Sequence, residues 1–356
     1  MGKLTKNNVM TASKVVVMLL LLFYIGNQVH WQDYQVVGTP GSTSSRPGLV
    51  SCLAGVHLLP FVLAIGFQFL ALLFTAYRWR LLMMVQGISL SRNSVLRLSF
   101  LGEFFNNFLP GAIGGDAIKA YYVMRHTGKK GSTVVSIIAS RFSGLLTMVE
   151  ISAVILTGWL FFAGDKAVAL KRPVFLVFFL AGVLGVILFA VLNEKINNSR
   201  LLRILIQNLP FNRQLEVIRD SMYRYRTMGR ILGPVLFYSV LIVLSFILSV
   251  MFAGISLEIE IAWYAYFIYL PLIMIMSAVP VTPGGIGVME ELFLYFFSST
   301  GDPQKILLMA LLYRFSVVFC SLPGGLILLS SDKISSMDLF ESNNDDKISE
   351  QSAAKL

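Results

Sequence analysis

The chain has 356 residues, of which 56% are hydrophobic and only 13% are charged. A soluble globular domain of this length needs more charged surface, so the composition excludes the ordinary soluble classes and indicates an integral membrane protein. The net charge of +10 does not indicate nucleic-acid binding, because the basic residues lie mainly between apolar runs, where membrane topology accounts for them.

The first half of the chain contains three apolar runs that we expect to cross the membrane, near 9–26, 50–77 and 132–162. A helix of about 20 residues spans the ~30 Å hydrocarbon layer. The first run follows a basic segment, as in a signal peptide, but residues 26–30 offer no A-x-A-like cleavage site, so we interpret it as a retained span. Proline and glycine interrupt the stretch 95–122, which we expect to form a re-entrant hairpin.

The second half repeats this organisation. Spans are predicted near 174–192, 231–254 and 304–330, with a second interrupted, re-entrant stretch at 260–298. The connection 195–230 alternates Leu and Ile with arginines, which is typical of an amphipathic segment lying on an anionic cytoplasmic leaflet. The polar tail, 332–356, has the composition of a disordered segment.

The distribution of Lys and Arg predicts the orientation. Basic residues precede the first span, flank 95–122 on both sides and fill 195–230, whereas the opposite loops carry few. Cytoplasmic loops are enriched in Lys and Arg, so we expect a multi-pass protein of the cell membrane with both termini in the cytoplasm.

Two motifs recur at one offset. The LPGAIGG segment containing Pro110 resembles the TPGGIG segment containing Pro283, and these prolines are separated by 173 positions. The Arg-Phe-Ser triplets that begin at Arg141 and Arg314 are separated by the same 173 positions. Three crossings per half reverse the orientation of the second half. The sequence therefore predicts an all-α integral membrane fold of two inverted repeats, 1–165 and 166–331, each with three transmembrane helices and a Pro/Gly-broken re-entrant hairpin.

The proline and glycine interruptions indicate where a site would lie. Backbone groups freed by such breaks cannot bond to lipid, so breaks persist where they are buried in protein or line a wet cavity. Alternatively they punctuate ordinary loops, but paired breaks at corresponding positions favour the re-entrant interpretation. The positions expected at the breaks are Pro110, Gly111, Gly114, Gly115, Pro283, Gly284, Gly285 and Gly287.

Arg141 and Arg314 each lie well inside an apolar run. A charge in the membrane interior is costly unless it meets a partner or water, so both are functional candidates. The guanidinium fork matches a phosphate bidentately, which points to a lipid headgroup. The alternative is an architectural arginine that pairs with a nearby acid.

Other polar residues accompany the hairpins. Glu103 and Asn107 would share one helix face, and Asp116 follows two glycines at a helix start, where anions bind or where Asp serves as an N-cap. The segment from Tyr77 to Arg80 is typical of an interfacial anchor. The candidate substrate-binding residues are Arg141, Arg314, Glu103, Asn106, Asn107, Asp116, Lys119 and Glu290.

No known catalytic motif occurs in the sequence. It has no G-x-S-x-G elbow, P-loop or zinc-ligand spacing, and its two cysteines, Cys52 and Cys320, lie far apart in apolar runs. We therefore expect no catalytic residue, no metal site and no cofactor, and a function other than that of an enzyme.

The segments FNNFLPGAIGGD at 105–116 and PVTPGGIGVME at 280–290, together with Arg141, resemble the lysylphosphatidylglycerol synthetase transmembrane-region family, also described as the flippase-like or UPF0104 membrane family. The resemblance covers residues from about 10 to 330. It implies re-entrant helices and movement of aminoacylated phospholipid, or another lipid-linked substrate, between leaflets. Lys119 stands where the family pattern leads us to expect Arg, which keeps the charge but loses bidentate geometry. We also expect a stand-alone member without the synthetase domain.

Three functional hypotheses follow. The first is a translocator of a phospholipid or a polyprenyl-phosphate-linked substrate, with Arg141 and Arg314 flanking one midplane cavity. The second is a membrane enzyme that modifies a lipid headgroup, of the phosphatidylglycerol aminoacyl-transfer type, with Glu and Asp as general acid or base. The third is a scaffold for a separate glycosyltransferase. Expected partners are membrane lipid, a separate lipid-modifying enzyme or further copies of the chain, and no nucleic acid.

Overall fold

The computed structural model describes residues 29–37, 43–108, 114–163, 171–193, 229–277, 285–298 and 300–330, together with positions 23, 24, 26, 27, 225 and 282. Nearly all of the predicted first span, most of the connection 195–230 and the whole tail 332–356 lie outside these residues. The same holds for four of the expected break positions, Pro110, Gly111, Pro283 and Gly284.

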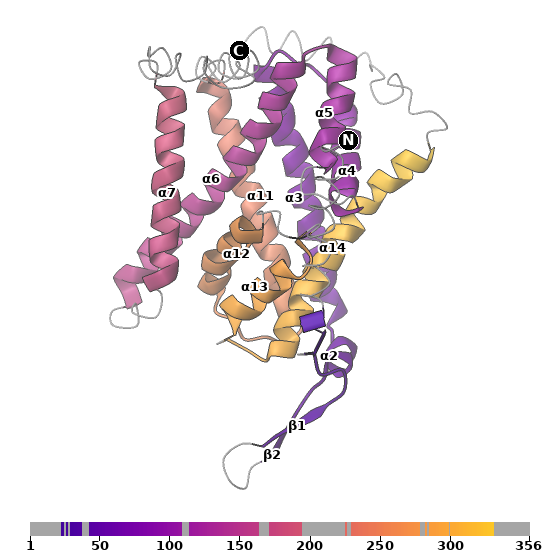
Figure 1. The fold of residues 1–356 in the computed structure, drawn as a ribbon, viewed down its shortest axis with the longest axis vertical. Helices are drawn as coiled ribbons and strands as arrows, with labels where there is room; N and C mark the ends of the chain where they lie inside the picture. Colours follow the sequence, from indigo (N-terminus) through magenta and orange to yellow (C-terminus); the bar gives the residue numbers. More distant parts are fainter. Residues whose placement is uncertain are drawn as a thin grey trace, which may run out of the picture.

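Helices dominate the described chain (Figure 1). Four of them are long and apolar enough to cross a membrane: α3 (Leu58–Val85), α6 (Lys130–Ala163), α11 (Gly229–Ser256) and α14 (Pro303–Ser330). Two others, α7 (Lys171–Leu192) and α12 (Trp263–Ser277), are apolar over a shorter stretch. With this many apolar helices, the protein is a multi-pass membrane protein of the all-α class.

A small β-hairpin was not expected from the sequence. Strand β1 (Tyr34–Val37) pairs antiparallel with β2 (Thr43–Arg46), and the hairpin projects from one end of the helical body (Figure 1). The backbone N–H of Gly48 donates to Asp33 Oδ1 over 2.7 Å. A hydrogen bond from the Ser51 side chain and this one from Gly48 favour the charged carboxylate, so they lower the pKa of Asp33.

Helix α3 is displaced along the chain relative to the expected span at 50–77. A short helix, α2 (Leu49–Ala54), precedes it, and the extended backbone at His57 separates the two helices. At its other end α3 continues to Val85 through the predicted anchor segment, in which Arg78 and Trp79 are only 5% and 3% exposed. The interpretation of this segment as an interfacial anchor is therefore wrong for these two side chains, which lie among other helices.

Several helices are too short to cross the bilayer alone. Helices α4 (Arg92–Phe108, 17 residues) and α5 (Gly114–Thr127, 14 residues) are about 26 and 21 Å long at 1.5 Å per residue, against ~30 Å of hydrocarbon. Helix α13 (Val288–Phe297) has 10 residues. Helices α4 and α5 lie side by side, and a Cβ on Gly115 would fall 1.8 Å from the Gly102 carbonyl oxygen. Glycine is therefore required where these two backbones touch.

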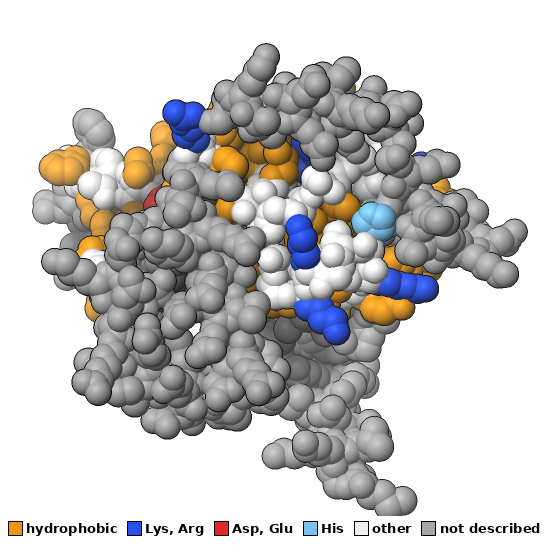
Figure 2. Space-filling model, turned by 90° about the horizontal axis from the view of Figure 1, so that it is seen from above, with side chains coloured by type: hydrophobic (Ala, Val, Ile, Leu, Met, Phe, Trp, Pro, Cys, Tyr) orange, Lys and Arg blue, Asp and Glu red, His pale blue; other side chains and the backbone are white. Residues whose placement is uncertain are grey.

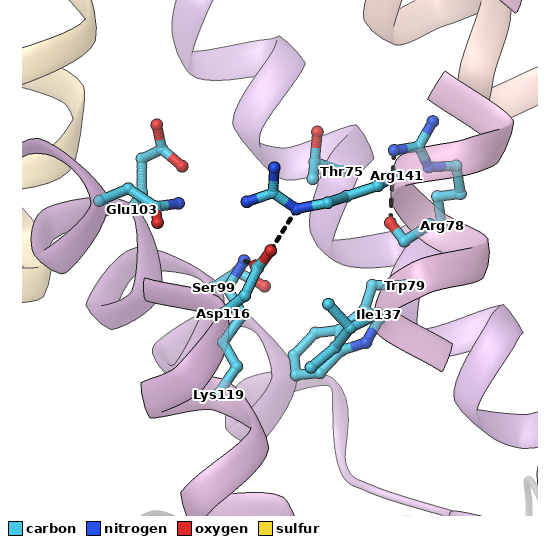
Figure 3. A pocket seen from close by; sticks show the side chains of 11 residues that line it. Thr75, Arg78, Trp79, Ser99, Glu103, Asp116, Lys119, Ile137 and Arg141 are labelled. Carbon is cyan, nitrogen blue, oxygen red and sulfur yellow. Dashed lines mark hydrogen bonds and ion pairs between the residues drawn. The ribbon is translucent and has the colours of Figure 1, made fainter. Parts of the chain in front are cut away.

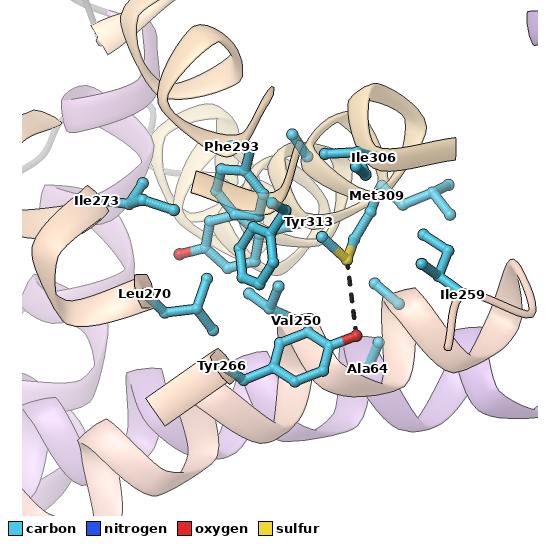
Figure 4. Packing of buried hydrophobic residues seen from close by; sticks show 14 of the residues in the cluster. Ala64, Val250, Ile259, Tyr266, Leu270, Ile273, Phe293, Ile306, Met309 and Tyr313 are labelled. Atoms are coloured by element: carbon cyan, nitrogen blue, oxygen red, sulfur yellow. Dashed lines mark hydrogen bonds between the residues drawn. The ribbon is translucent and has the colours of Figure 1, made fainter. Parts of the chain in front are cut away.

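The main apolar core lies between α3, α11, α12, α13 and α14 (Figure 4). Helices α3 and α11 pack along much of their lengths, and the Ser249 hydroxyl donates to the Ala64 carbonyl over 2.8 Å. Tyr266 reaches Met309, while Phe293 is fully buried. By contrast, Phe175 on α7 is 72% exposed, as expected of a side chain facing lipid tails. This core packs the long helices α3, α11 and α14 against the short helices α12 and α13.

Candidate functional site

A polar cavity of about 160 Å³ lies between α3, α4, α5 and α6 (Figure 3). It adjoins the α4–α5 pair, the first of the interrupted stretches. Each of these four helices contributes polar side chains to the cavity wall, although α3 and α6 are largely apolar helices. The lining residues are Thr75, Arg78, Trp79, Ser99, Glu103, Asn106, Asp116, Lys119, Ile137, Ser140 and Arg141.

Asp116 organises the charges on one side of the cavity. Arg141 Nε donates to Asp116 Oδ2, and Lys119 Nζ lies 3.7 Å from Asp116 Oδ1. The Asp116 side chain is 12% exposed, whereas that of Arg141 is 50% exposed. Asp116 lies in the first turn of α5, where a carboxylate is favoured by the helix dipole. The carboxylate thus holds two cations at the cavity wall, and one of them remains accessible.

The amides of α4 have different roles. Asn106 Oδ1 accepts the Gly115 backbone N–H over 2.9 Å, which ties the start of α5 to α4. Asn107 Nδ2 donates to the carbonyl of Glu103 within α4, and Asn107 is not among the residues that line the cavity. The structure therefore places Glu103 and Asn106 at the cavity, whereas Asn107 is not among its lining residues.

Arg78 also lines the cavity, although it was not predicted from the sequence. Its Nη1 donates to Ser239 Oγ over 3.0 Å and its Nη2 to Ser140 Oγ over 3.3 Å. Its Nε is buried without a hydrogen-bond partner. A Cβ on Gly144 would lie 3.3 Å from Nη1, so this glycine leaves the space that the guanidinium occupies.

A sequence signal for the Arg78 position exists on α6. Ser136, Ser140 and Gly144 recur every four residues and share one helix face. Trp79 Nε1 donates to Ser136 Oγ over 3.3 Å, next to the Arg78–Ser140 bond. A stripe of small and hydroxyl side chains in an apolar helix indicates close packing against a neighbour that carries polar groups.

Two charged residues of the second half, Arg314 and Glu290, form an ion pair at the start of α13. Arg314 Nε donates to Glu290 Oε1, and Arg314 Nη2 donates to the Gly285 carbonyl over 3.3 Å. Glu290 Oε2 accepts the Gly287 backbone N–H over 2.8 Å. Gly285 and Gly287 have φ values of +66° and +86°, which side chains disfavour. The ion pair thereby fixes the backbone where α13 begins.

Arg141 and Arg314 were expected to flank a single cavity, but neither Arg314 nor Glu290 is among the residues lining the cavity of Figure 3. Each arginine instead has its own carboxylate, Asp116 for Arg141 and Glu290 for Arg314. Glu290 is only 3% exposed. A carboxylate beside each arginine thus balances its charge locally.

Comparison with known proteins gives the family of the chain. The family model described as the lysylphosphatidylglycerol synthase TM region matches residues 12–324, most of the chain. The chain belongs to this family. The matched region includes the cavity residues of α3 to α6 and both arginine–carboxylate pairs.

A curated relative agrees with the assignment. The chain is similar to a UPF0104 membrane protein of Pyrococcus horikoshii, with 23% identity over 303 residues. The alignment covers 77% of this chain and 87% of the relative.

Proposed function

We propose that this family member translocates a phospholipid, or another lipid-linked substrate, between the leaflets of the cell membrane. The observation that carries the proposal is the charged cavity beside the α4–α5 pair, inside a body of apolar helices. Ionisable side chains within membrane-spanning segments are costly and usually mark the path of a polar substrate. A lipid headgroup is a polar substrate that reaches such a cavity from the bilayer itself.

The arrangement of the two interrupted helix pairs supports alternating access. In Figure 1 the α4–α5 pair lies in the upper part of the molecule and the α12–α13 pair in the lower part. Each pair stands next to a long helix that supplies its arginine, α6 or α14. If the two pairs are inverted repeats, each would open a path for the lipid headgroup from one leaflet to the middle of the protein.

The basic face supports the proposed orientation. Figure 2, which looks down on the upper end of Figure 1, shows Lys and Arg side chains on the described part of that face. Exposed Arg92 and Arg125 lie near the outer ends of α4 and α5. Because Lys and Arg are enriched on the cytoplasmic side of membrane proteins, this face is assigned to the cytoplasm in the proposal. The cavity of the first half then lies toward the cytoplasmic leaflet.

Arg141 is the residue best placed to receive an incoming headgroup. Its side chain is half exposed, and its partner Asp116 is shared with Lys119. An incoming phosphate would take the place of Asp116 on the guanidinium fork while Lys119 keeps the carboxylate paired. The corresponding pair in the second half, Arg314 and Glu290, is less exposed to solvent.

A groove beside the site suits the acyl chains. It has a volume of about 460 Å³ and lies between α4 and the end of α14. Helix α4 contributes to both the groove and the cavity, so a lipid could place its tails and headgroup on either side of one helix. The groove is lined by Asn93, Leu96, Arg97, Phe100, Pro323, Leu326 and Ile327.

The proposal is tested with purified protein in liposomes that contain a trace of fluorescent phosphatidylglycerol. A membrane-impermeant reductant quenches the outer leaflet, and further quenching reports translocation. Wild-type protein is expected to translocate the lipid, and Arg141→Gln to slow it at least about tenfold, since a hydrogen-bonded charge is worth about 1.5–3 kcal/mol.

The matched control is Arg92→Gln, which removes an exposed arginine at the start of α4 and should leave the rate unchanged. Absence of translocation by folded wild-type protein would contradict the proposal. Chemical conversion of the lipid during the same assay, detected by mass spectrometry, would favour a headgroup-modifying enzyme instead.

A further inference from the structure

Arg78 differs from the other cations of the cavity in its partners. Arg78 is buried, with a relative exposure of only 5%. Among the described residues its hydrogen bonds go only to the hydroxyls of Ser239 and Ser140. Arg141 and Lys119, in contrast, share the carboxylate of Asp116. Arg78 is thus a buried cation that the described residues supply with dipoles but with no opposite charge.

Burying a cation without a counter-charge costs free energy, and this cost persists as long as no anion binds. A buried charge needs a counter-charge and full hydrogen bonding to offset the loss of its hydration. Arginine has five N–H donors, and two of those on Arg78 are bonded to hydroxyl groups. The Nε donor is buried and has no acceptor. The guanidinium therefore retains capacity for an anion.

The charge balance of the cavity also indicates capacity for an anion. Three cations, Arg78, Lys119 and Arg141, line it with two carboxylates, Glu103 and Asp116, so one positive charge is in excess. A phosphodiester carries one negative charge. The volume of about 160 Å³ is several times the ~30 Å³ that one water molecule occupies, so a phosphate-sized group has room.

We propose that Arg78 is an anion-binding residue and that the Arg78 end of the cavity takes a singly charged phosphate group, the phosphodiester of a lipid headgroup. The anion competes with Ser140 for Nη2, whose bond is the longer of the two at 3.3 Å, and reaches the buried Nε only as the guanidinium turns toward it. Arg141 then serves as the accessible first contact and Arg78 as the deeper one. The identity of the anion as a headgroup rests on the proposed function, whereas the anion site itself does not.

The binding experiment uses the full-length protein in detergent and isothermal titration calorimetry. Dihexanoyl phosphatidylglycerol is the phosphodiester probe, inorganic phosphate is the headgroup-free probe, and dihexanoylglycerol is the neutral probe. Arg78→Gln is expected to weaken phosphodiester binding about 10- to 100-fold, the range for a hydrogen bond to a charged group. Arg78→Lys should give an intermediate affinity, because the charge stays while the fork is lost.

The control is Arg80→Gln, two positions away on α3, whose Nε donates to the Leu90 carbonyl and which does not line the cavity. It should bind the phosphodiester as wild type does. Gly144→Ala provides a second variant that keeps Arg78, because the added methyl would press on Nη1. It should weaken binding several-fold in protein with a normal melting temperature.

Wild-type affinity in folded Arg78→Gln and in Gly144→Ala would overturn the anion site, even if lipid translocation is intact. Conversely, Arg78-dependent binding by a protein that does not translocate lipid would uphold the site and reject the proposed function. Equal binding of inorganic phosphate would assign the site to free phosphate, whereas a preference for the lipid probe would assign it to a headgroup.

Discussion

At the scale of single residues, the two arginine–carboxylate pairs differ in exposure. The Arg141 side chain is 50% exposed, whereas Arg314 is 24% and Glu290 4% exposed. Glu290 also accepts a backbone hydrogen bond from Gly287. The first pair is therefore suited to exchange partners with a ligand, and the second is suited to hold the start of α13.

Glu290→Gln should consequently destabilise the protein strongly. Removing one partner of a buried pair leaves an uncompensated charge and typically costs about 3–5 kcal/mol. The measurement is thermal unfolding in detergent, followed by the loss of the monodisperse peak in size exclusion. The matched control is Glu258→Gln, since Glu258 is 70% exposed in its pair with His57 and should change stability little. Equal melting temperatures for both variants would contradict the assigned role of Glu290.

The residues that could be predicted from sequence were those whose local context is unusual. Arg141, Asp116 and Lys119 stand next to glycine breaks or inside an apolar run, and the structure brings them to one cavity. Arg78 could not be found in this way, because a run of aromatic and basic residues has the same local pattern at a membrane interface as in a packed core. Its placement depends on Ser140 and Ser239, which are distant in sequence.

At the scale of elements, the decisive feature is the length of the helices on either side of each break. Helices α4 and α5 each fall short of the hydrocarbon thickness, and they are joined by the Asn106–Gly115 bond and the close glycine contact. A pair of short, closely packed helices is what the predicted re-entrant hairpin requires. The sequence suggested the breaks, but the β-hairpin and the start of α3 depended on contacts that no single segment encodes, such as Gly48 with Asp33.

Cysteine labelling can test the hairpin. Single cysteines replacing exposed Arg92 and His126, near the outer ends of α4 and α5, should both react with an impermeant maleimide from the cytoplasmic side only. Glu260→Cys, before α12, should react from the opposite side. The native Cys52 and Cys320 are buried and give a low background. Reaction of the cysteines at positions 92 and 126 from opposite sides would make the α4–α5 segment a full crossing and would contradict the re-entrant arrangement.

At the scale of the whole molecule, family membership, apolar helices and a charged cavity together favour a lipid as the substrate. The expectation of one cavity shared by both arginines stays a prediction: Arg141 lines the cavity of the first half, and each arginine has its own carboxylate partner. The proposed transport cycle uses the two arginine–carboxylate pairs, one in each half. The groove beside α4 lies on the same helix as the cavity of the first half, which suits the proposed place of the acyl chains.

The central claim is that a lipid headgroup occupies the cavity between α3, α4, α5 and α6. The most direct measurement is photocrosslinking in nanodiscs with a phospholipid that carries a diazirine on its headgroup, followed by mapping of the labelled peptides. We expect labels to concentrate on residues 99–141, to fall with excess unlabelled lipid and to decrease in Arg141→Gln. Labels spread evenly over lipid-facing surfaces such as α7, with no competition by unlabelled lipid, would contradict the account.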